Sequence, residues 1–273
     1  MTAKKKVLVT GASGLIGGIV VKNLAHKYEL SALNRRPVKE IPCLEADIAD
    51  LDAILPAFRD IDTVLHLAGY TDDVTDWEGT ERVNIRGTYN VYEAARRNGV
   101  RRIVFASSGG VMLGYELDSP YTEIVAAEYD RIPAEWTMIP DTAPVRPITV
   151  CYVSKVFGEV LGRIYSDQYG ISVLNIRLGA VLAEDKPALR RHYPGYLSHE
   201  DCVQMIEKCI DAPKTLQYDI FQAISNNRYR WRDIEHARKV IGYEPTGSAE
   251  NFEIADKGGR HQVSSTPRPS QYS

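Results

Sequence analysis

The feature that most constrains the fold is a glycine repeat near the start of the chain. Gly11, Gly14 and Gly17 fall at G-x-x-G-x-x-G spacing directly after an apolar run at positions 7–9. The residues that follow, up to position 24, carry apolar side chains at a helical period. The sequence therefore predicts a buried strand, a tight turn and a helix whose first backbone amides point at a ligand.

Each glycine has a separate role in such a turn. We expect Gly11 to permit the turn, Gly14 to let the backbone approach a pyrophosphate, and Gly17 to let helix and strand pack closely. This unit predicts a dinucleotide site, and the alternative is a glycine-rich turn without a ligand. The side chains and amides that complete the expected contact with the dinucleotide belong to Ser13, Leu15 and Ile16.

Charge and cysteine usage exclude several classes of protein. The formal net charge of −3 gives no basic surface for nucleic acid or an anionic membrane. No apolar run reaches the roughly 20 residues that span a bilayer, and no signal peptide is evident. The four cysteines match neither C-x-x-C nor zinc spacing, so we expect no metal. A cytoplasmic protein that binds neither nucleic acid nor membrane is predicted.

The end of the second predicted strand, residues 29–33, bears on cofactor choice. An acidic residue there would bind the ribose hydroxyls of NAD and disfavour a 2′-phosphate. This chain instead has Asn34, Arg35 and Arg36, and guanidinium groups suit phosphate. The sequence predicts NADP, with NAD as the alternative if the arginines only solvate the strand end. After a third strand at 42–45, Asp47 and Ile48 are expected beside the adenine.

Strands and helices alternate through the rest of the first two-thirds of the chain. Strands are expected at 63–67, 101–107 and 172–177, and helices at 51–58, 78–98 and 150–168. Alternation of this kind predicts an α/β fold, a doubly wound parallel sheet of the Rossmann type. Leu67, Ala68 and Gly69 end the fourth strand, where small residues let the nicotinamide ribose approach. His66 is expected to be a packed strand residue, and Asn84 either holds backbone groups of the site or lies on a helix surface.

The predicted organisation is a dinucleotide-binding domain with a small C-terminal lobe. Residues 1–180 form the Rossmann part, 181–255 a substrate-covering lobe of the same structural domain, and 256–273 a flexible tail. The lobe is expected to contain a helix at 199–210, a strand at 216–222 and a helix at 231–241. The long, aromatic stretch 115–149 is expected to be a lid or binding loop.

Six motifs occur in an order that resembles the extended short-chain dehydrogenase/reductase family, also called the NAD-dependent epimerase/dehydratase family. They are TGASGLIG (10–17), Asp47-Ile48, HLAG (66–69), VNIRGTYN (83–90), SSGGV (107–111) and SKVFGE (154–159). Residues 176–185, 189–210 and 225–250 are similar to uronate dehydrogenases and related aldose dehydrogenases. The resemblance implies an NAD(P)-dependent oxidoreductase of carbohydrate metabolism that oxidises the anomeric carbon of a sugar, a sugar acid or a similar polar substrate.

The resemblance also implies catalytic residues, with one departure. Ser108 matches the family serine, and Lys155 matches the lysine of Tyr-x-x-x-Lys, which also holds the nicotinamide ribose. Cys151 stands in the tyrosine position, and Tyr152 comes one residue late, a helical rotation of about 100°. Three hypotheses stay open: Tyr152 reaches the site, Cys151 acts as a thiolate base or nucleophile, or the chain is a dinucleotide-binding sensor or scaffold with weak turnover.

For the substrate, the resemblance implies a partly altered site. Arg191 matches the arginine that holds the carboxylate in uronate dehydrogenases, and Thr71 stands where that group has a serine. Beside Ser108, Gly109-Gly110 replaces an Asn-His pair, and Ala180 replaces a serine. The loop at 115–149 is longer than in those enzymes, and Tyr121 or Trp136 would be able to fill the added room. A sugar-nucleotide epimerase or dehydratase is the alternative enzyme. A homodimer formed through helices 78–98 and 150–168 is also implied.

Overall fold

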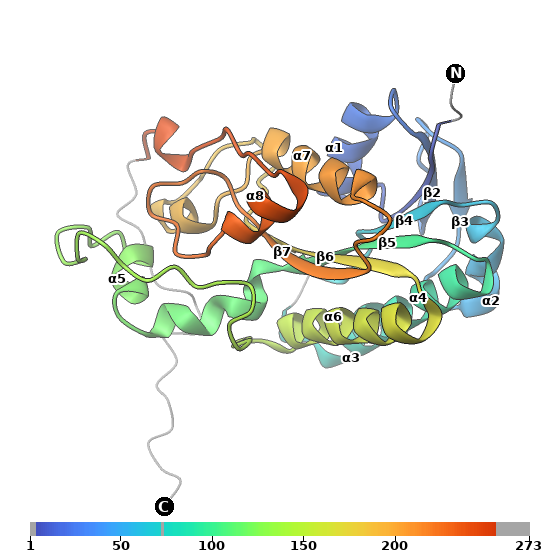
Figure 1. Ribbon diagram of the computed structural model, residues 1–273, viewed down its shortest axis with the longest axis horizontal. Coiled ribbons are helices and arrows are strands. Elements are labelled where there is room, and N and C mark those ends of the chain that lie inside the picture. Colours follow the sequence, from blue (N-terminus) through green and yellow to red (C-terminus); the bar gives the residue numbers. More distant parts are fainter. Residues whose placement is uncertain (1–3, 72–73, 255–273) are drawn as a thin grey trace, which may run out of the picture.

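A single parallel sheet forms the centre of the protein. The computed structural model describes residues 4–71 and 74–254. Seven strands pair in the order β3-β2-β1-β4-β5-β6-β7, and every pair is parallel. The strands are β1 (Lys6–Thr10), β2 (Glu29–Asn34), β3 (Cys43–Glu45), β4 (Thr63–His66), β5 (Arg102–Ser108), β6 (Ser172–Leu178) and β7 (Tyr218–Ala223). The predicted doubly wound fold is confirmed (Figure 1).

Helices cover both faces of this sheet. The α-helices of the described residues are α1 (Leu15–Leu24), α2 (Leu51–Ile54), α3 (Trp77–Gly79), α4 (Thr88–Arg97), α5 (Tyr121–Val125), α6 (Val150–Tyr169), α7 (His199–Asp211) and α8 (Glu235–Ile241). Strand side chains alternate between the faces: Val7 and Val9 pack with α1 and α7, whereas Leu8 packs with α4 and α6. The Val-Leu-Val run is apolar throughout because both faces of β1 are covered.

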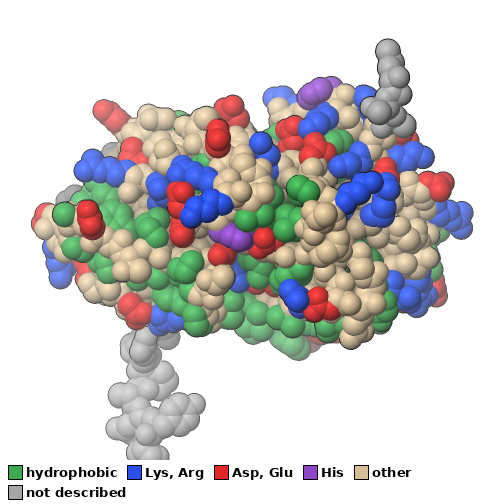
Figure 2. Space-filling model, in the orientation of Figure 1, with side chains coloured by type: hydrophobic (Ala, Val, Ile, Leu, Met, Phe, Trp, Pro, Cys, Tyr) green, Lys and Arg blue, Asp and Glu red, His purple; other side chains and the backbone are tan. Residues whose placement is uncertain are grey.

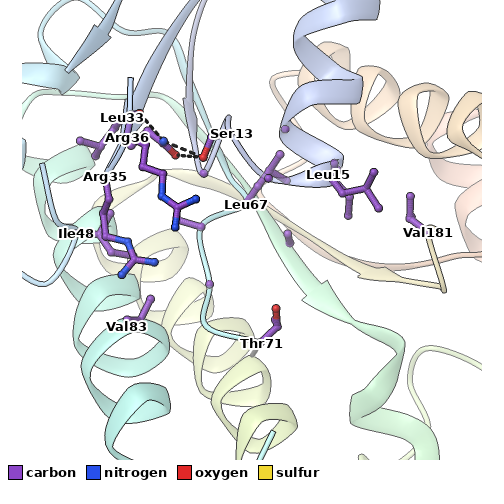
Figure 3. Close-up of a pocket in the computed structure, with 18 of the residues that line it drawn as sticks. Ser13, Leu15, Leu33, Arg35, Arg36, Ile48, Leu67, Thr71, Val83 and Val181 are labelled. Carbon is purple, nitrogen blue, oxygen red and sulfur yellow. Dashed lines mark hydrogen bonds between the residues drawn. The ribbon is translucent and has the colours of Figure 1, made fainter. Parts of the chain in front are cut away.

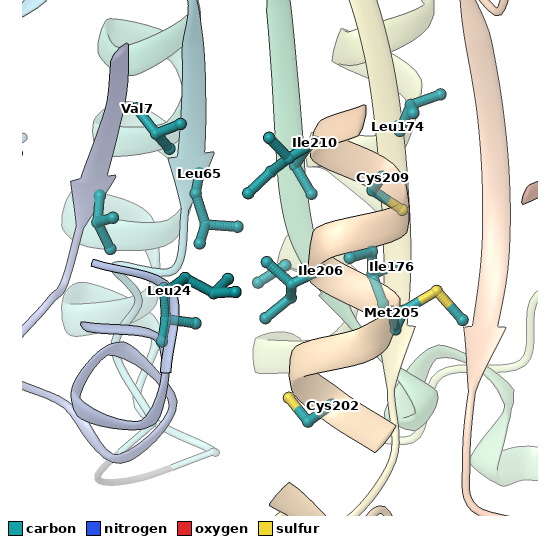
Figure 4. Packing of buried hydrophobic residues seen from close by; sticks show 14 of the residues in the cluster. Val7, Leu24, Leu65, Leu174, Ile176, Cys202, Met205, Ile206, Cys209 and Ile210 are labelled. Atoms are coloured by element: carbon teal, nitrogen blue, oxygen red, sulfur yellow. The ribbon is translucent and has the colours of Figure 1, made fainter. Parts of the chain in front are cut away.

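The face covered by α1 and α7 buries two of the four cysteines. Figure 4 shows Cys202 and Cys209 on α7 with Met205 and Ile206, packed toward the strands. Both thiols are fully buried, and burial raises the pKa of Cys202 to about 12. These cysteines are therefore inert packing residues of the core.

The segment before α8 differs from the expected helix at 231–241. Ile139 N–H donates to the carbonyl of Trp231 (2.7 Å), and Asp233 N–H donates to the carbonyl of Ile139 (2.9 Å). These bonds form a short parallel pairing, so α8 begins only at Glu235. The helical period continued too far because the side chains of Trp231 and Ile234 are buried by tertiary contacts instead.

The long stretch 115–149 is fixed to the body of the protein at several points. Besides the Ile139 pairing, Arg146 N–H donates to the carbonyl of Val111, and the Trp136 indole donates to the carbonyl of Arg230. Tyr121 packs against Trp231, and Trp136 stacks on Tyr229. These two aromatic side chains therefore build a core of their own, not the filling of the substrate site considered above.

The C-terminal region is continuous with the sheet. Residues 181–254 contribute β7 to the sheet and α7 to its cover, and the expected tail at 256–273 lies outside the described residues. Acidic and basic side chains alternate over the face shown in Figure 2. Of the helices within the described ranges, none has both the length and the apolarity to cross a bilayer.

Candidate active site

The turn between β1 and α1 brings backbone against backbone. Gly11 has a φ of +73°, and a Cβ there would lie 2.7 Å from the amide nitrogen of Ala68. A Cβ at Gly17 would lie 2.4 Å from the carbonyl oxygen of Gly11. Neither position accepts a side chain without movement of the backbone, because both neighbouring groups belong to the main chain. The backbone of Gly14 is extended and its carbonyl accepts the amide of Gly18, so the amides that precede Gly18 in the first turn of α1 have no acceptor inside the helix.

A pocket of about 610 Å³ opens over this turn, where β1 lies between β2 and β4. This is the switch point of the sheet, at which doubly wound folds bind their ligands. All the residues assigned to the cofactor from sequence line it: Gly11, Ser13, Gly14, Leu15, Ile16, Gly17, Asn34, Arg35, Arg36, Asp47, Ile48, Leu67, Ala68, Gly69 and Lys155. Thr71 lines it as well, and Figure 3 shows how the labelled members of this set surround the cavity.

Five assigned residues do not line this pocket: Ser108, Gly109, Cys151, Tyr152 and Arg191. The sequence did not assign several residues that do line it: Leu33, Ala46, Val83, Ala106, Gly179, Ala180 and Val181. Gly179 and Ala180 extend the pocket toward the segment that carries Arg191, since Ala180 pairs with Tyr196 in a short bridge. The dinucleotide pocket therefore borders a strand end that pairs with the segment after Arg191.

The end of β2 is held by an asparagine. The Asn34 amide donates to the carbonyl of Arg36 (2.6 Å) and to Ser13 Oγ (2.9 Å). This fixes the loop that carries Arg35 and Arg36, whose exposed guanidinium groups extend toward the cavity in Figure 3. The guanidinium groups of Arg35 and Arg36 thus lie beside the strand end at which an acidic residue would select NAD.

Asp47 lines the same pocket as these arginines. Burial acts to raise the pKa of its carboxyl group, but the amide of Ala49 and the guanidinium of Arg82 outweigh that effect and leave the pKa below its ordinary value. Both groups hydrogen-bond the carboxylate. Asp47 is therefore an ionised acceptor on the pocket wall.

Lys155 projects from α6 to the inner end of the pocket. Its Nζ donates to the carbonyl of Ala106 (2.9 Å), and a Cβ at Gly69 would lie 3.3 Å from the same Nζ. Burial lowers the pKa of this ammonium group. The lysine is thus fixed between the ends of β4 and β5, with donors left for a ligand.

Cys151 faces a different part of the site from Tyr152. Its Sγ lies 3.6 Å from the carbonyl oxygen of Tyr70 and 3.9 Å from the Asn84 amide nitrogen. Asn84 sits in the π-helical turn Thr80–Gly87 and hydrogen-bonds both main-chain groups of Tyr70, so it holds the loop after β4. Burial raises the pKa of the Cys151 thiol, and Lys155 only partly opposes this.

Two glycines at the end of β5 are each covered by a side chain. A Cβ at Gly110 would lie 2.3 Å from the ring of Tyr152, and one at Gly109 would lie 2.5 Å from the guanidinium of Arg232. The residue before them, Ser108, accepts the amide of Gly110 at 3.0 Å. Tyr152 and Arg232 therefore occupy the space that side chains at 109 and 110 would need.

Arg191 is already paired in this structure. Its guanidinium contacts the carboxylate of Glu116 at 2.5 Å, and both side chains are largely buried. Burial raises the pKa of the nearby Tyr152, with Arg232 and Arg191 opposing. Three charged groups and one phenol thus meet beside the end of β5.

His66 is a packed strand residue, as the sequence predicted. Its two ring nitrogens hydrogen-bond Thr10 Oγ1 (2.8 Å) and Thr88 Oγ1 (3.2 Å). Burial, with a smaller contribution from Lys155, lowers its pKa to about 3. The imidazole is neutral and holds β1, β4 and α4 together below the pocket.

Comparison with known proteins agrees with this geometry. The model of the NAD dependent epimerase/dehydratase family matches residues 7–200. The chain belongs to this family. It is 34% identical to the L-arabinose 1-dehydrogenase (NAD(P)(+)) of Haloferax volcanii, over 88% of this chain and 96% of that one. It is 32% identical to the NAD-dependent glucose-6-phosphate dehydrogenase of the same organism, over 90% and 95% of the two chains.

Solved structures of the family give the same result. A mutant of Agrobacterium tumefaciens uronate dehydrogenase complexed with NAD is 31% identical, with a TM-score of 0.77 over 92% of this chain and 88% of that one. The fold class, the family and the class of NAD(P)-dependent oxidoreductase expected from sequence are confirmed by these relatives.

The sequence does not identify two residues of the site in this family member. Arg232 falls within the helix expected at 231–241, and Glu116 falls within the long loop expected at 115–149. The only signal for Arg232 is an arginine between two residues of an apolar period, Trp231 and Ile234, which is also common on helix surfaces. Both are brought to the site by tertiary contacts, so no local motif identifies them.

Proposed function

We propose that the chain oxidises a sugar or sugar acid at its anomeric carbon and that NADP is its preferred cofactor. The observation that carries the proposal is that one continuous pocket joins the glycine turn to Lys155. Support also comes from the relatives, which are named as dehydrogenases of arabinose, glucose 6-phosphate and uronate.

The residues present fit a nicotinamide dinucleotide. Gly11 and Gly17 leave no space for a side chain, so main-chain amides face the site of the pyrophosphate. When bound, such a cofactor accepts a hydride from the substrate carbon. Lys155 would hold the nicotinamide ribose, and Ser108 would orient the reacting hydroxyl group. Asn34, Arg35 and Arg36 favour the 2′-phosphate of NADP over the free hydroxyl of NAD.

Tyr152 is the proton acceptor that the contacts support best. Its hydroxyl makes no hydrogen bond with any described residue, and its ring lies against Gly110 next to Ser108. The Cys151 thiol instead donates to the Tyr70 carbonyl. Burial raises the pKa of both side chains, so their contacts distinguish them and their pKa shifts do not. Because the thiol proton is already engaged by a main-chain acceptor, thiol chemistry is the weaker alternative.

The decisive experiment is cofactor reduction by the purified chain with a panel of aldoses and uronic acids, using both NAD and NADP. Tyr152→Phe, Cys151→Ser and Cys151→Tyr are measured beside the native chain. Loss of activity in Tyr152→Phe alone supports the proposal, and loss in Cys151→Ser supports thiol chemistry. A native chain that binds cofactor but oxidises no sugar would contradict the proposal. It would then favour a sensor or, if a sugar nucleotide is converted, an epimerase or dehydratase.

A homodimer in the cytoplasm completes the proposal. Large apolar side chains are exposed on α3, α4 and α6, with Trp77 and Val160 each 59% exposed. Figure 2 shows hydrophobic side chains gathered along the lower edge of the face shown, where α6 runs in Figure 1. Such a surface suits burial against a second copy. The four cysteines are free thiols, which fits a reducing compartment. A monomer in sedimentation at micromolar concentration would contradict the dimer.

A further inference from the structure

Arg232 is a buried cation for which the described residues supply no hydrogen-bond acceptor and no acidic partner. Its side chain belongs to a residue only 5% exposed, and its Nε is fully enclosed without a hydrogen-bond acceptor. Within the described residues its guanidinium forms neither a hydrogen bond nor an ion pair. Buried arginines are ordinarily paired, because an unpaired buried charge opposes folding. This arrangement indicates that an acceptor from outside the chain completes the group.

The guanidinium lies between two backbone segments of the substrate side. One of its terminal nitrogens would be 2.5 Å from a Cβ at Gly109 and 3.4 Å from one at Gly195. The opposite contact is the indole of Trp231, 4.5 Å from the guanidinium carbon. Gly195 in turn lies against Gly179, which lines the dinucleotide pocket. The cation is therefore held beside a segment that borders the pocket, and against the residue that follows Ser108.

The other charges nearby cancel one another. Glu116 and Arg191 form a buried ion pair, so the carboxylate is not available to Arg232 alone, and the arginine is not free for a ligand. Burial lowers the pKa of Arg232 to about 10, with Glu116 opposing, so the group stays charged at neutral pH. The cluster of Arg191, Glu116 and Arg232 thus has one positive charge in excess.

We propose that Arg232 binds the carboxylate of a sugar-acid substrate, whereas the charge of Arg191 is neutralised by Glu116. This proposal rests on the proposed function for the reaction, but the anion site itself is defined by the contacts of Arg232. A planar guanidinium suits a planar carboxylate. One excess positive charge matches a monoanion better than a phosphate monoester, which carries about 1.5 to 2 negative charges near neutral pH. A neutral aldose would leave the buried cation unpaired.

The first test measures binding without turnover. Gulonate, a monocarboxylate that has no anomeric carbon to oxidise, is compared with the neutral polyol sorbitol by calorimetry, with saturating NADP and without it. We expect the native chain to prefer gulonate, Arg232→Gln to lose that preference and Arg232→Lys to keep part of it. The matched control is the double variant Glu116→Gln with Arg191→Gln, which removes both charges of the pair and leaves the excess charge unchanged. It should retain the preference for gulonate.

The second test measures the ratio of kcat/KM for glucuronate to that for glucose, with glucose 6-phosphate as a third substrate. We expect Arg232→Gln to lower the glucuronate-to-glucose ratio on the order of 100-fold, as loss of one partner of a buried charge pair does. The double variant should change this ratio far less. Thermal unfolding of each variant shows that it is folded under the assay conditions.

Each result bears on the proposal. An unchanged ratio in Arg232→Gln, or a ratio lost only in the double variant, overturns it, and so does a native preference for glucose 6-phosphate over glucuronate. Equal binding of gulonate and sorbitol by the native chain also overturns it. Failure of the proposed function is distinct: no sugar is then oxidised, yet gulonate binding that depends on Arg232 still supports the anion site.

Discussion

The ring of Tyr152 lies directly over Gly110, where an added Cβ would be 2.3 Å from two ring carbons. Because Tyr152 is one residue beyond the usual tyrosine position, its side chain leaves α6 in a different direction from that expected for the family. Glycine at 110 provides the space that this direction requires. The position of Tyr152 in the sequence and the glycine at 110 are therefore structurally coupled.

Gly110→Ala is expected to displace the Tyr152 ring. Overpacking of this kind costs about 1–3 kcal/mol in the free energy of unfolding. A shift of the ring of about 1 Å is also expected to lower kcat by about 100-fold. Urea denaturation and steady-state kinetics measure the two effects.

The control for this variant is Gly18→Ala in α1, where nothing lies within 4 Å of the added Cβ. Alanine is favoured over glycine inside a helix, so this control should gain about 0.5–1 kcal/mol in stability. Equal stability and activity of Gly110→Ala and the native chain would contradict the contact.

Tyr152→Phe is expected to remove the pH dependence of kcat along with most of the activity. Burial raises the pKa of Tyr152, so the deprotonated fraction grows as the pH rises from neutral to alkaline. The native rate should increase over that range, since only the phenolate accepts the proton. General acid–base groups contribute about 100- to 10,000-fold, which sets the size of the loss. Cys151→Ser, measured over the same pH range, should keep the slope; a slope lost there would identify the thiol instead.

Arg35→Ala with Arg36→Ala is expected to weaken NADP more than NAD. Removal of the two guanidinium groups should raise KM for NADP by a factor of about 10 to 100. Each charge-assisted hydrogen bond contributes about 1.5–3 kcal/mol to the free energy of binding, and solvent and salt screen part of this at an exposed site. Lys39→Ala in the same exposed loop is the matched control for charge. NADP affinity that stays the same in the double variant would refute the preference.

Stability is expected to fall as the pH drops below about 6.5, in part through His66. Its native pKa is lowered to about 3, whereas histidine in an unfolded chain titrates near 6.5. Between these values the unfolded chain binds a proton that the native chain does not, so the free energy of unfolding decreases toward acid pH. Urea midpoints between pH 7 and 5 should show a shallower slope for His66→Gln. An imidazole resonance of His66 that titrates near pH 6.5 in the folded protein would contradict this.

Local sequence predicted the elements around the cofactor well, and the reason is physical. The apolar run at 7–9, the glycine turn and the following helix are adjacent in the chain, so each residue signals its own environment. The positions of Asn34, Arg35 and Arg36 were predictable for the same reason, because the end of the second strand in a doubly wound sheet borders the pocket.

The substrate side was harder to predict because its residues are positioned by distant partners. The backbone of Trp231 and Asp233 bonds to Ile139, and that pairing turns an expected helical residue, Arg232, toward Gly109. Glu116 is recognisable as a residue of the site only through its ion pair with Arg191, which lies in another loop. The hydrophobic periodicity of a sequence does not reveal such pairings, because it describes only residues that are near one another along the chain.

The pairing of Ile139 with the segment around Arg232 also concerns how specificity is able to change. The carbonyl of Ile139 also accepts a hydrogen bond from the side-chain amide of Gln222 in β7. The long loop therefore connects the edge of the sheet to the segment that carries Arg232. A deletion in the loop would release Arg232 even though every ligand-contacting residue was retained. We therefore expect that a change of substrate preference, in evolution or by engineering, requires replacement of the loop and of residues 231–233 at the same time.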